Sequence, residues 1–325
     1  MRGLVLQRSM MPPAADAGLI GGIVATVPWA DLQSAPGSQL PTGNAIDQAI
    51  SVAKAFNAAH PATPIYVKIR IIAGIGAPMW AKTLDGFRPV KVTNTASGQS
   101  GTVGPFWTAA YAAAYADLQA KLAVRYDAEP LVRDVTVSQC MTVFAEPFQR
   151  DEDFTGFYAQ GYTVAADQAC LRQQIDAHRI WKHTHQSLSF NPYRPWQLDQ
   201  SGGISQSLMS EDFVLQEMRY CRTALGALCT LENNSIRFSF IGMQSAAAQA
   251  APQARQYAVM YRAIASMGPA ITFQTAGPRT VGNLPATVRW AVSLGANSVE
   301  IGQMYDAAQM QTDNAALLAN PTGTG

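Results

Sequence analysis

A (β/α)8 barrel, built as one domain over residues 1–325, is the fold class that the sequence predicts. Short apolar runs alternate with longer helical runs along the whole chain, which is the element order of such a barrel. Several short runs are continuously apolar, as expected of parallel strands covered by helices. Two glutamates, Glu146 and Glu300, end two of these runs. Because barrel chemistry lies where strands end, these carboxylates are the first candidates for function.

Eight runs have the length and residue types of strands. They cover residues 3–7, 21–27, 65–72, 135–141, 187–190, 236–240, 271–274 and 298–301. Six helical patterns cover residues 42–57, 106–126, 165–183, 210–228, 252–267 and 285–294. The last of them stops before Gly295, a frequent helix-ending residue. The long connections at residues 74–105 and 147–162 are expected to form loops at the active face.

An open, doubly wound sheet is the competing architecture. It would carry a glycine-rich dinucleotide fingerprint after a strand and before a helix. Here Gly74-Ile75-Gly76 is followed at once by Ala77-Pro78, so no helix opens there. The barrel is therefore preferred, and no cofactor is predicted.

The composition narrows the classes of partner. Charged residues make up 14% of the chain, the formal net charge is +1, and no block of lysine or arginine stands out. Nucleic-acid binding and attachment to a membrane surface are therefore disfavoured. The apolar stretch at residues 17–27 is too short to cross a bilayer. Neutral polar and aromatic residues dominate the loops, which suits a neutral substrate such as a sugar.

Four cysteines, Cys140, Cys170, Cys221 and Cys229, form no Cys-x-x-Cys pair, which argues against structural zinc. Cys221 and Cys229 could close a small disulfide loop, and buried free thiols are the alternative. The even cysteine count favours an extracellular or periplasmic protein, and a cytoplasmic location stays open. The sequence His183-Thr184-His185 resembles a metal-binding pair. It precedes a strand, on the stability face, so no metal is predicted.

Glu146 and Glu300 each allow a functional and a structural interpretation. Glu146 follows an apolar run and precedes Pro147, where partial burial could raise its pKa enough to make it an acid. It could instead pair with Arg150. Glu300 lies in an apolar strand, where an unpaired charge would be costly. It could instead form a buried ion pair with Arg70 or Arg289. Cleavage of a glycosidic bond requires two such carboxylates.

Arg70 lies in the third predicted strand, on the same face as Lys68 by period-two alternation. It could support a catalytic carboxylate through a charge-assisted hydrogen bond. A barrel-interior ion pair is an equally acceptable role, and the two roles are compatible.

Aromatic and amide side chains follow several predicted strands. An aromatic ring offers a flat apolar surface that suits the C–H face of a sugar. Amides can bond sugar hydroxyls or orient a carboxylate. The predicted substrate-binding residues are Trp29, Asp31, Arg70, Trp80, Gln139, Asn191, Trp196, Gln274 and Tyr305. We expect the aromatic members to line one groove.

Two segments resemble clan A glycoside hydrolases, in particular bacterial β-galactosidases. Residues 27–37 (VPWADLQSAPG) are similar to their second-strand segment, and residues 73–80 (AGIGAPMW) to their third-strand segment. The resemblance implies a (β/α)8 barrel, Glu146 as the acid/base and retention of configuration. Two departures stand out. Ala145 precedes Glu146 where the family has asparagine, and Gln274 ends the seventh strand where the family has its nucleophile.

The leading hypothesis is therefore a glycoside hydrolase that cleaves O-glycosidic bonds in a poly- or oligosaccharide. Glu146 would protonate the leaving oxygen, and Glu300 would act as nucleophile or as base for water. No cofactor is needed for this chemistry. A carbohydrate-binding barrel without hydrolysis is the alternative, and a lyase or isomerase using Arg70 and a carboxylate is a third.

Overall fold

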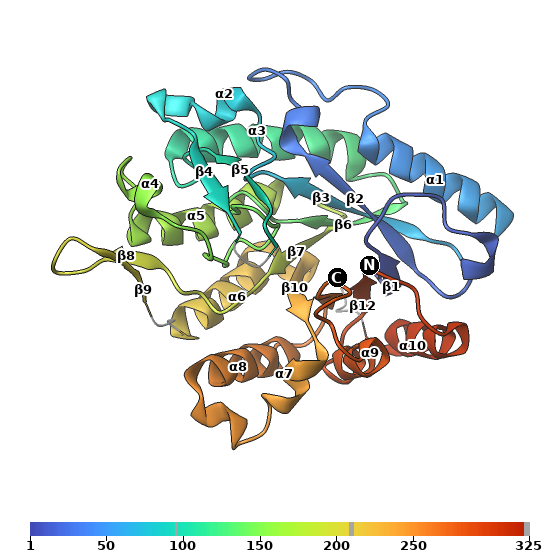
Figure 1. Ribbon diagram of the computed structural model, residues 1–325. Coiled ribbons are helices and arrows are strands. Elements are labelled where there is room, and N and C mark those ends of the chain that lie inside the picture. The colour runs from blue at the N-terminus through green and yellow to red at the C-terminus, as the bar shows by residue number, and fades with distance from the viewer. Residues whose placement is uncertain (95–96, 208–210, 322–325) are drawn as a thin grey trace.

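The computed structural model describes residues 1–94, 97–207 and 211–321. Eight parallel strands close into a barrel in the order β1-β12-β11-β10-β7-β6-β3-β2, with β2 returning to β1 (Figure 1). The barrel strands are β1 (Gly3–Leu6), β2 (Gly22–Pro28), β3 (Tyr66–Ile72), β6 (Val132–Thr136), β7 (His185–Ser189), β10 (Cys229–Ile236), β11 (Ile271–Thr275) and β12 (Ser298–Ile301). The predicted (β/α)8 barrel is confirmed.

Seven long helices surround the barrel (Figure 1). They are α1 (Ala45–Ala59), α3 (Ala109–Tyr126), α5 (Val164–Ala177), α6 (Glu211–Leu225), α8 (Pro252–Ser266), α9 (Leu284–Ser293) and α10 (Ala307–Ala319). Short helices α2 (Met79–Lys82), α4 (Thr155–Tyr158) and α7 (Phe238–Gly242) lie in the loops. Turns of 3-10 helix occupy Ala14–Asp16, Trp29–Asp31, Leu84–Gly86, His178–Ile180, Gly226–Leu228 and Ala248–Ala250.

Polar caps fix where several helices begin. The side chains of Asn44, Thr108, Thr163, Asn283 and Asp306 each accept a hydrogen bond from a backbone N–H in the first turn of the helix that follows. Such caps satisfy donors that have no partner within the helix. The buried residues of each helix form the stripe that faces the strands, so capping and apolar pattern agree on the helix register.

Two barrel strands and one long helix differ from the sequence prediction. The sixth strand is Cys229–Ile236, whereas residues 236–240 were expected and mostly form α7. This strand was missed because it contains Glu232, Asn233 and Asn234, and charged and amide residues are unusual in a buried strand. The fourth strand ends at Thr136, so Glu146 lies in the following loop. Helix α10 was not predicted, although Asp306 is a good cap.

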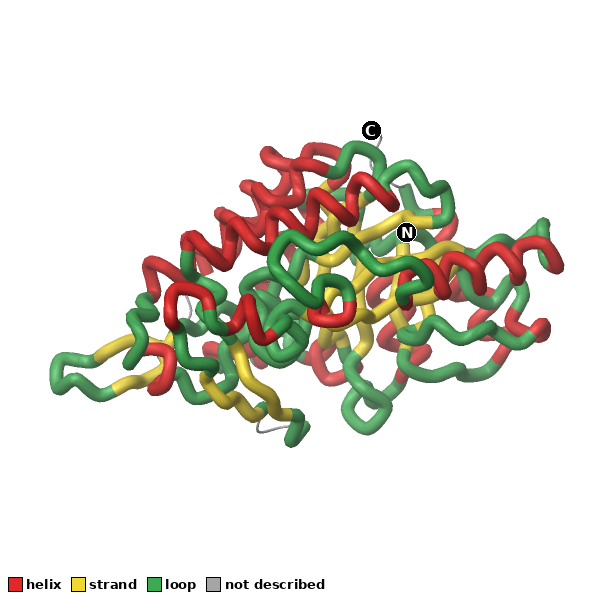
Figure 2. The backbone as a smooth tube through the Cα atoms, turned by 90° about the horizontal axis from the view of Figure 1, so that it is seen from above, coloured by secondary structure: helices red, strands yellow, loops and turns green. Residues whose placement is uncertain are grey.

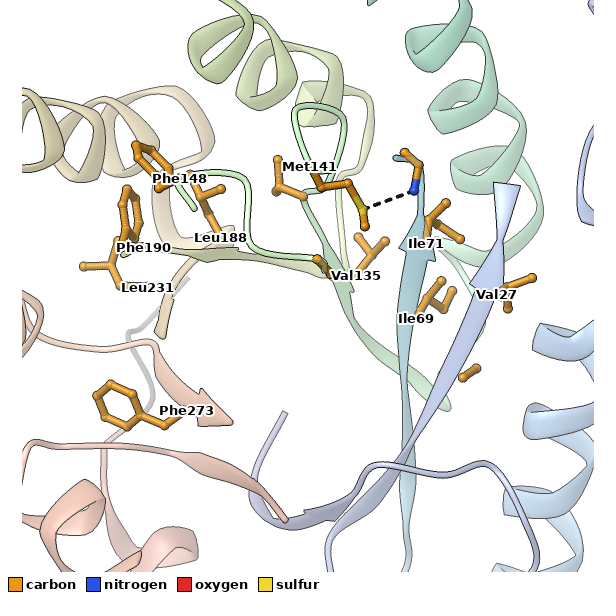
Figure 3. Packing of buried hydrophobic residues seen from close by; sticks show 14 of the residues in the cluster. Val27, Ile69, Ile71, Val135, Met141, Phe148, Leu188, Phe190, Leu231 and Phe273 are labelled. Carbon is orange, nitrogen blue, oxygen red and sulfur yellow. Dashed lines mark hydrogen bonds between the residues drawn. The ribbon is translucent and has the colours of Figure 1, made fainter. Parts of the chain in front are cut away.

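The main apolar core lies between the barrel and its helices. Strand residues that face outward, such as Ile69, Ile71, Val135 and Leu188, are fully buried (Figure 3). Phe148 lies beside Phe190, with ring centroids 4.9 Å apart, and so ties the loop after β6 to the end of β7. The inward face of the barrel is more polar, and this difference sets the position of the charges described below.

Two hairpins and two disulfides shape the loops. Hairpin β4 (Val90–Thr93)–β5 (Ser100–Val103) follows the third barrel strand, and hairpin β8 (Trp196–Leu198)–β9 (Ile204–Gln206) follows the fifth. Both project from the same side of the molecule (Figure 2). Disulfides join Cys140 to Cys170 and Cys221 to Cys229. The proposed Cys221–Cys229 loop is therefore correct, and the free-thiol alternative is wrong.

Candidate active site

A cavity of about 870 Å³ opens where the barrel strands end. Its walls include Gln7 after β1, Glu146 after β6, Asn191 after β7, Asn234 of β10 and Gln274 of β11. These residues come from five separate strand ends, so the barrel closure brings them together. This is the face on which barrel enzymes carry their chemistry.

The loop that carries Glu146 is held at several points. The disulfide of Cys140 anchors its start to α5, and the Phe148 ring anchors its middle. Gly74 permits the loop to cross the end of β3, because a Cβ atom there would lie only 1.9 Å from the Thr142 carbonyl oxygen. The Ile75 N–H donates to the same oxygen over 2.9 Å. Glu146 is therefore presented to the cavity by an anchored loop.

Glu146 is a buried carboxyl at the cavity wall, with 9% of its surface exposed. Burial raises its pKa to about 8, with help from the charges of Asp151 and Glu232 and against those of Arg70 and Arg237. The carboxyl is therefore largely protonated at neutral pH. In that state it can donate a proton, which an ordinary exposed glutamate cannot do.

A chain of amide hydrogen bonds orients Asn191. Tyr261 donates its hydroxyl to the Asn233 Oδ1 atom over 2.7 Å, and Asn233 donates Nδ2 to the Asn191 Oδ1 atom over 3.0 Å. The Asn191 Nδ2 atom is thereby left as a donor with no acceptor among the described residues. Asn191 is only 4% exposed, so this donor is buried at the cavity wall.

Asn234 presents the complementary group. Its Nδ2 atom donates to the Ala145 carbonyl oxygen over 3.3 Å, which leaves Oδ1 as a buried acceptor without a donor in the described part of the chain. Asn234 is also 4% exposed. Since buried polar groups normally have partners, an unpaired donor and an unpaired acceptor on one cavity indicate a polar ligand.

A cluster of charges occupies the barrel interior beneath the cavity. Lys68 Nζ lies 2.7 Å from Glu232 Oε1, 2.7 Å from Glu300 Oε1 and 4.0 Å from Asp134 Oδ1. Arg70 Nη2 lies 2.5 Å from Glu300 Oε2. All five side chains come from different positions on β3, β6, β10 and β12, and alternation turns them inward.

The two predicted catalytic glutamates have opposite electrostatics. Burial would raise the pKa of Glu300, but the neighbouring cations Arg70 and Lys68 lower it to about 2. Burial likewise acts to lower the pKa of Lys68, yet Glu232 and Glu300 raise it overall. Glu300 is therefore ionised and fully paired, whereas Glu146 is protonated.

Three of the predicted site residues, Glu146, Asn191 and Gln274, line the cavity. Glu300 and Arg70 do not, because they neutralise each other below it. Gln139 is fully buried and donates to the Phe106 carbonyl oxygen. Asp31 is exposed at the end of a 3-10 turn.

The predicted aromatic groove does not form. Trp29 is fully buried and packs edge-on against Trp80 at 5.6 Å between ring centroids. Trp196 donates its indole N–H to the Arg150 carbonyl oxygen. Tyr305 donates its hydroxyl to Asp313. These rings are anchored by partners within the protein, and none of them is at the cavity.

Several residues of the site were missed from sequence. Glu232 and Asn234 belong to the strand that was misplaced, and Thr230, Glu232 and Asn234 would share one face by period-two alternation. Asp151 and Arg237 also line the cavity. Asp151 lies in the loop expected at residues 147–162, and nothing in its local sequence separates it from Asp153.

The described residues contain neither a cluster of metal-ligating side chains nor a helix that could cross a membrane. No three or more His, Cys, Asp or Glu side chains among them could hold a metal ion together. His183 and His185 line a separate cavity with Tyr66 and Arg133, where strands begin. Within the same residues, no helix has the length and apolar character needed to cross a bilayer.

Comparison with known proteins gives similarity in fold only. No family model and no curated protein sequence matches the chain. The structure resembles a β-galactosidase from the psychrophilic Marinomonas ef1, with 11% identity and a TM-score of 0.49, over 97% of this chain and 59% of that one. It also resembles an endoglucanase from Pseudomonas stutzeri, with 13% identity and a TM-score of 0.48, over 99% and 95%.

A cold-adapted β-galactosidase from Rahnella sp. R3 is similar at 11% identity and a TM-score of 0.42, over 97% of this chain and 56% of that one. The chain spans little more than half the length of the two β-galactosidases. The barrel assignment rests on the strand pairing given above, and any chemistry has to be argued from the residues of the cavity.

Proposed function

We propose that the protein is a glycoside hydrolase with Glu146 as its general acid. One observation carries the proposal. A buried carboxyl with a pKa raised to about 8 lies on the same cavity as the unpaired amide groups of Asn191 and Asn234. Protonation of a leaving oxygen requires a protonated carboxyl next to groups that can bind a polar ligand, and this cavity has both.

A carbohydrate fits the cavity because its hydroxyls both donate and accept hydrogen bonds. One hydroxyl can accept from Asn191 Nδ2 and another can donate to Asn234 Oδ1, so both buried amides gain partners. The rings of Phe240 and Tyr257 line the cavity and stack with centroids 4.3 Å apart. They supply an apolar wall for the C–H face of a sugar.

A second carboxylate is needed, and we assign this role to Asp151. Asp151 lines the cavity and its charge raises the pKa of Glu146, so the two groups lie within electrostatic reach. Glu300, the candidate from sequence, is held by Lys68 and Arg70. We give Glu300 the role of neutralising those cations below the cavity.

The steps follow from these assignments. Glu146 transfers its proton to the glycosidic oxygen as the C–O bond breaks, and the Asp151 carboxylate bonds to the anomeric carbon. Water then displaces Asp151 and returns a proton to Glu146, so both carboxyls regain their starting states. Two displacements at one carbon retain its configuration. NMR of the first-formed anomer tests this, and an inverted first product would contradict the role given to Asp151.

The decisive experiment compares three variants on a broad panel of oligosaccharides. Glu146→Gln and Asp151→Asn should each lower kcat on any substrate that the wild type cleaves, while circular dichroism stays native. Asp153→Asn is the matched control, because Asp153 is an exposed loop residue that accepts a hydrogen bond from the Thr155 N–H and does not line the cavity. Full turnover by Glu146→Gln would refute the proposal.

A carbohydrate-binding barrel without hydrolysis is the second candidate. It is favoured by Gln274, an amide at the seventh-strand position where the resembled family has its nucleophile. This function predicts sugar binding by calorimetry and no product from any glycan in the panel. In that case Glu146→Gln would leave affinity almost unchanged.

The two disulfides support a location outside the reducing cytoplasm. Cys140–Cys170 and Cys221–Cys229 account for all four cysteines. Disulfides persist mainly in secreted and periplasmic proteins. We therefore propose that the protein works in an oxidising compartment, which suits degradation of an external polysaccharide. Thiol titration of protein isolated from its native host tests this, and four free thiols would contradict it.

A further inference from the structure

We propose that the cavity selects a sugar carrying an anionic group, a carboxylate or a sulfate ester, with Arg237 as its main ligand and Arg279 as a second cation. The inference rests on the proposed function only in taking the ligand to be a carbohydrate. It adds that the carbohydrate is anionic, whereas the amino-acid composition of the loops suggested a neutral sugar.

The guanidinium group of Arg237 is held in place by the protein and has donors available to a ligand. Its Nε atom donates to the Ser235 carbonyl oxygen over 3.1 Å, and its plane lies over the Phe240 ring at 4.6 Å from the centroid. Within residues 1–94, 97–207 and 211–321, no group accepts a hydrogen bond from its two Nη atoms and no carboxylate lies within 4.0 Å. A fixed guanidinium with two free parallel donors matches the geometry of a carboxylate or sulfate.

The other arginines of the cavity have partners. Arg150 Nη2 lies 2.6 Å from Asp167 Oδ1, and both side chains are buried. Arg194 lies 3.9 Å from Asp151. Arg237 and Arg279 are thus the cavity arginines left without an ion pair among the described residues. The cavity therefore carries an excess of positive charge that a neutral ligand would leave uncompensated.

Two further hydrogen-bond donors lie on the same cavity. Asn191 Nδ2 is a buried donor without an acceptor, and protonated Glu146 also donates. Arg237 is close enough to Glu146 for its charge to lower the pKa of that carboxyl. An acceptor-rich group would therefore bind next to the bond to be cleaved, where its charge helps to select the substrate.

Binding measurements on the Glu146→Gln variant test the inference without turnover. Calorimetry would compare galacturonate, glucuronate and mannuronate oligosaccharides with their carboxyl-reduced forms, which keep sugar and linkage but lose the charge. A sulfated galactan oligosaccharide and its desulfated form make the second arm. We expect at least one anionic ligand to bind about 10–100-fold more tightly than its neutral counterpart, the worth of a charge-assisted hydrogen bond.

Adding Arg237→Gln should abolish that preference, and Arg279→Gln should reduce it. Arg219→Gln is the matched control, since Arg219 is exposed on α6 and does not line the cavity. Preferential binding of the uronate oligosaccharides identifies the anionic group as a carboxylate, and preferential binding of the sulfated galactan identifies it as a sulfate. Equal affinity for charged and uncharged forms, or an equal loss for both in Arg237→Gln, would overturn the inference.

These experiments distinguish a failure of the anionic-ligand inference from a failure of the proposed hydrolase function. Neutral glycans that bind and are cleaved by the wild type would leave the hydrolase standing and refute the anionic class. Anionic glycans that bind through Arg237 but yield no product would support the anionic class and refute hydrolysis.

Discussion

A glutamate in the barrel interior and a glutamate in the cavity above it have pKa values shifted in opposite directions. Inside, Glu300 contacts Lys68 and Arg70, and its pKa falls to about 2. At the mouth, no lysine or arginine in the described part of the chain forms an ion pair with Glu146, and burial raises its pKa to about 8. In one region the glutamate is ion-paired with two cations, and in the other the carboxyl lies beside the unpaired amide groups of Asn191 and Asn234.

The largest expected effect is on turnover. Glu146→Gln should lower kcat by about 10²–10⁴-fold, the usual contribution of a positioned acid. The reason is that glutamine cannot release the proton that the leaving oxygen needs. Initial rates on the best substrate of the panel provide the measurement. A loss of less than threefold, with the fold intact, would remove Glu146 from the chemistry.

Glu300→Gln should act on stability. Breaking a buried ion pair costs about 3–5 kcal/mol in free energy of unfolding, because Arg70 keeps its charge without its partner. Urea denaturation at neutral pH gives this quantity. The control is Glu211→Gln, which breaks the exposed pair with Arg255 and should cost under about 1 kcal/mol. If Glu300→Gln is as stable as the wild type but inactive, Glu300 is catalytic and our division of roles fails.

The pH dependence should separate the two regions. The pKa of Glu146 is raised, so kcat/KM should be sustained at neutral pH and fall as pH rises through about 8. Because the charge of Arg237 lowers that pKa, Arg237→Gln should move the alkaline limb to higher pH. Carboxyl carbon NMR, assigned with the two glutamine variants, should find Glu146 titrating near 8 and Glu300 near 2. Similar titration of both would contradict the comparison.

Glu146→Gln should also give a gain in stability that depends on pH. Folded Glu146 binds its proton up to about pH 8 and an unfolded glutamate only up to about 4.5, so the wild type loses stability as pH rises across that window. Glutamine does not titrate there. The melting temperature of the variant should match the wild type at pH 4 and exceed it at pH 9, by about 2–4 °C for each kcal/mol gained. An unchanged difference across this range would argue against burial as the cause.

Sequence pattern alone predicted the parts of the site that depend on local order. Apolar runs and helical stripes were sufficient for six of the eight barrel strands and for six helices, whereas the fourth strand was predicted at residues 135–141 and lies at Val132–Thr136. Glu146 and Asn191 were found because each follows a predicted strand, and Gln274 because it ends one. The sixth strand failed for a physical reason, since Glu232 is compatible with a buried strand only when Lys68, far away in sequence, lies 2.7 Å from it.

The order of elements along the chain determined that this protein is a closed barrel with its polar loops at one end, because periodicity fixes which residues face the helices. The tertiary structure decided which carboxylate is paired. Glu146 and Glu300 look alike in sequence, and only the approach of Lys68 and Arg70 across the barrel separates them. Likewise, Trp29 and Trp80 pack against each other and not against a ligand. Pairing and packing across the barrel depend on distances in space, which residue spacing along one strand does not contain.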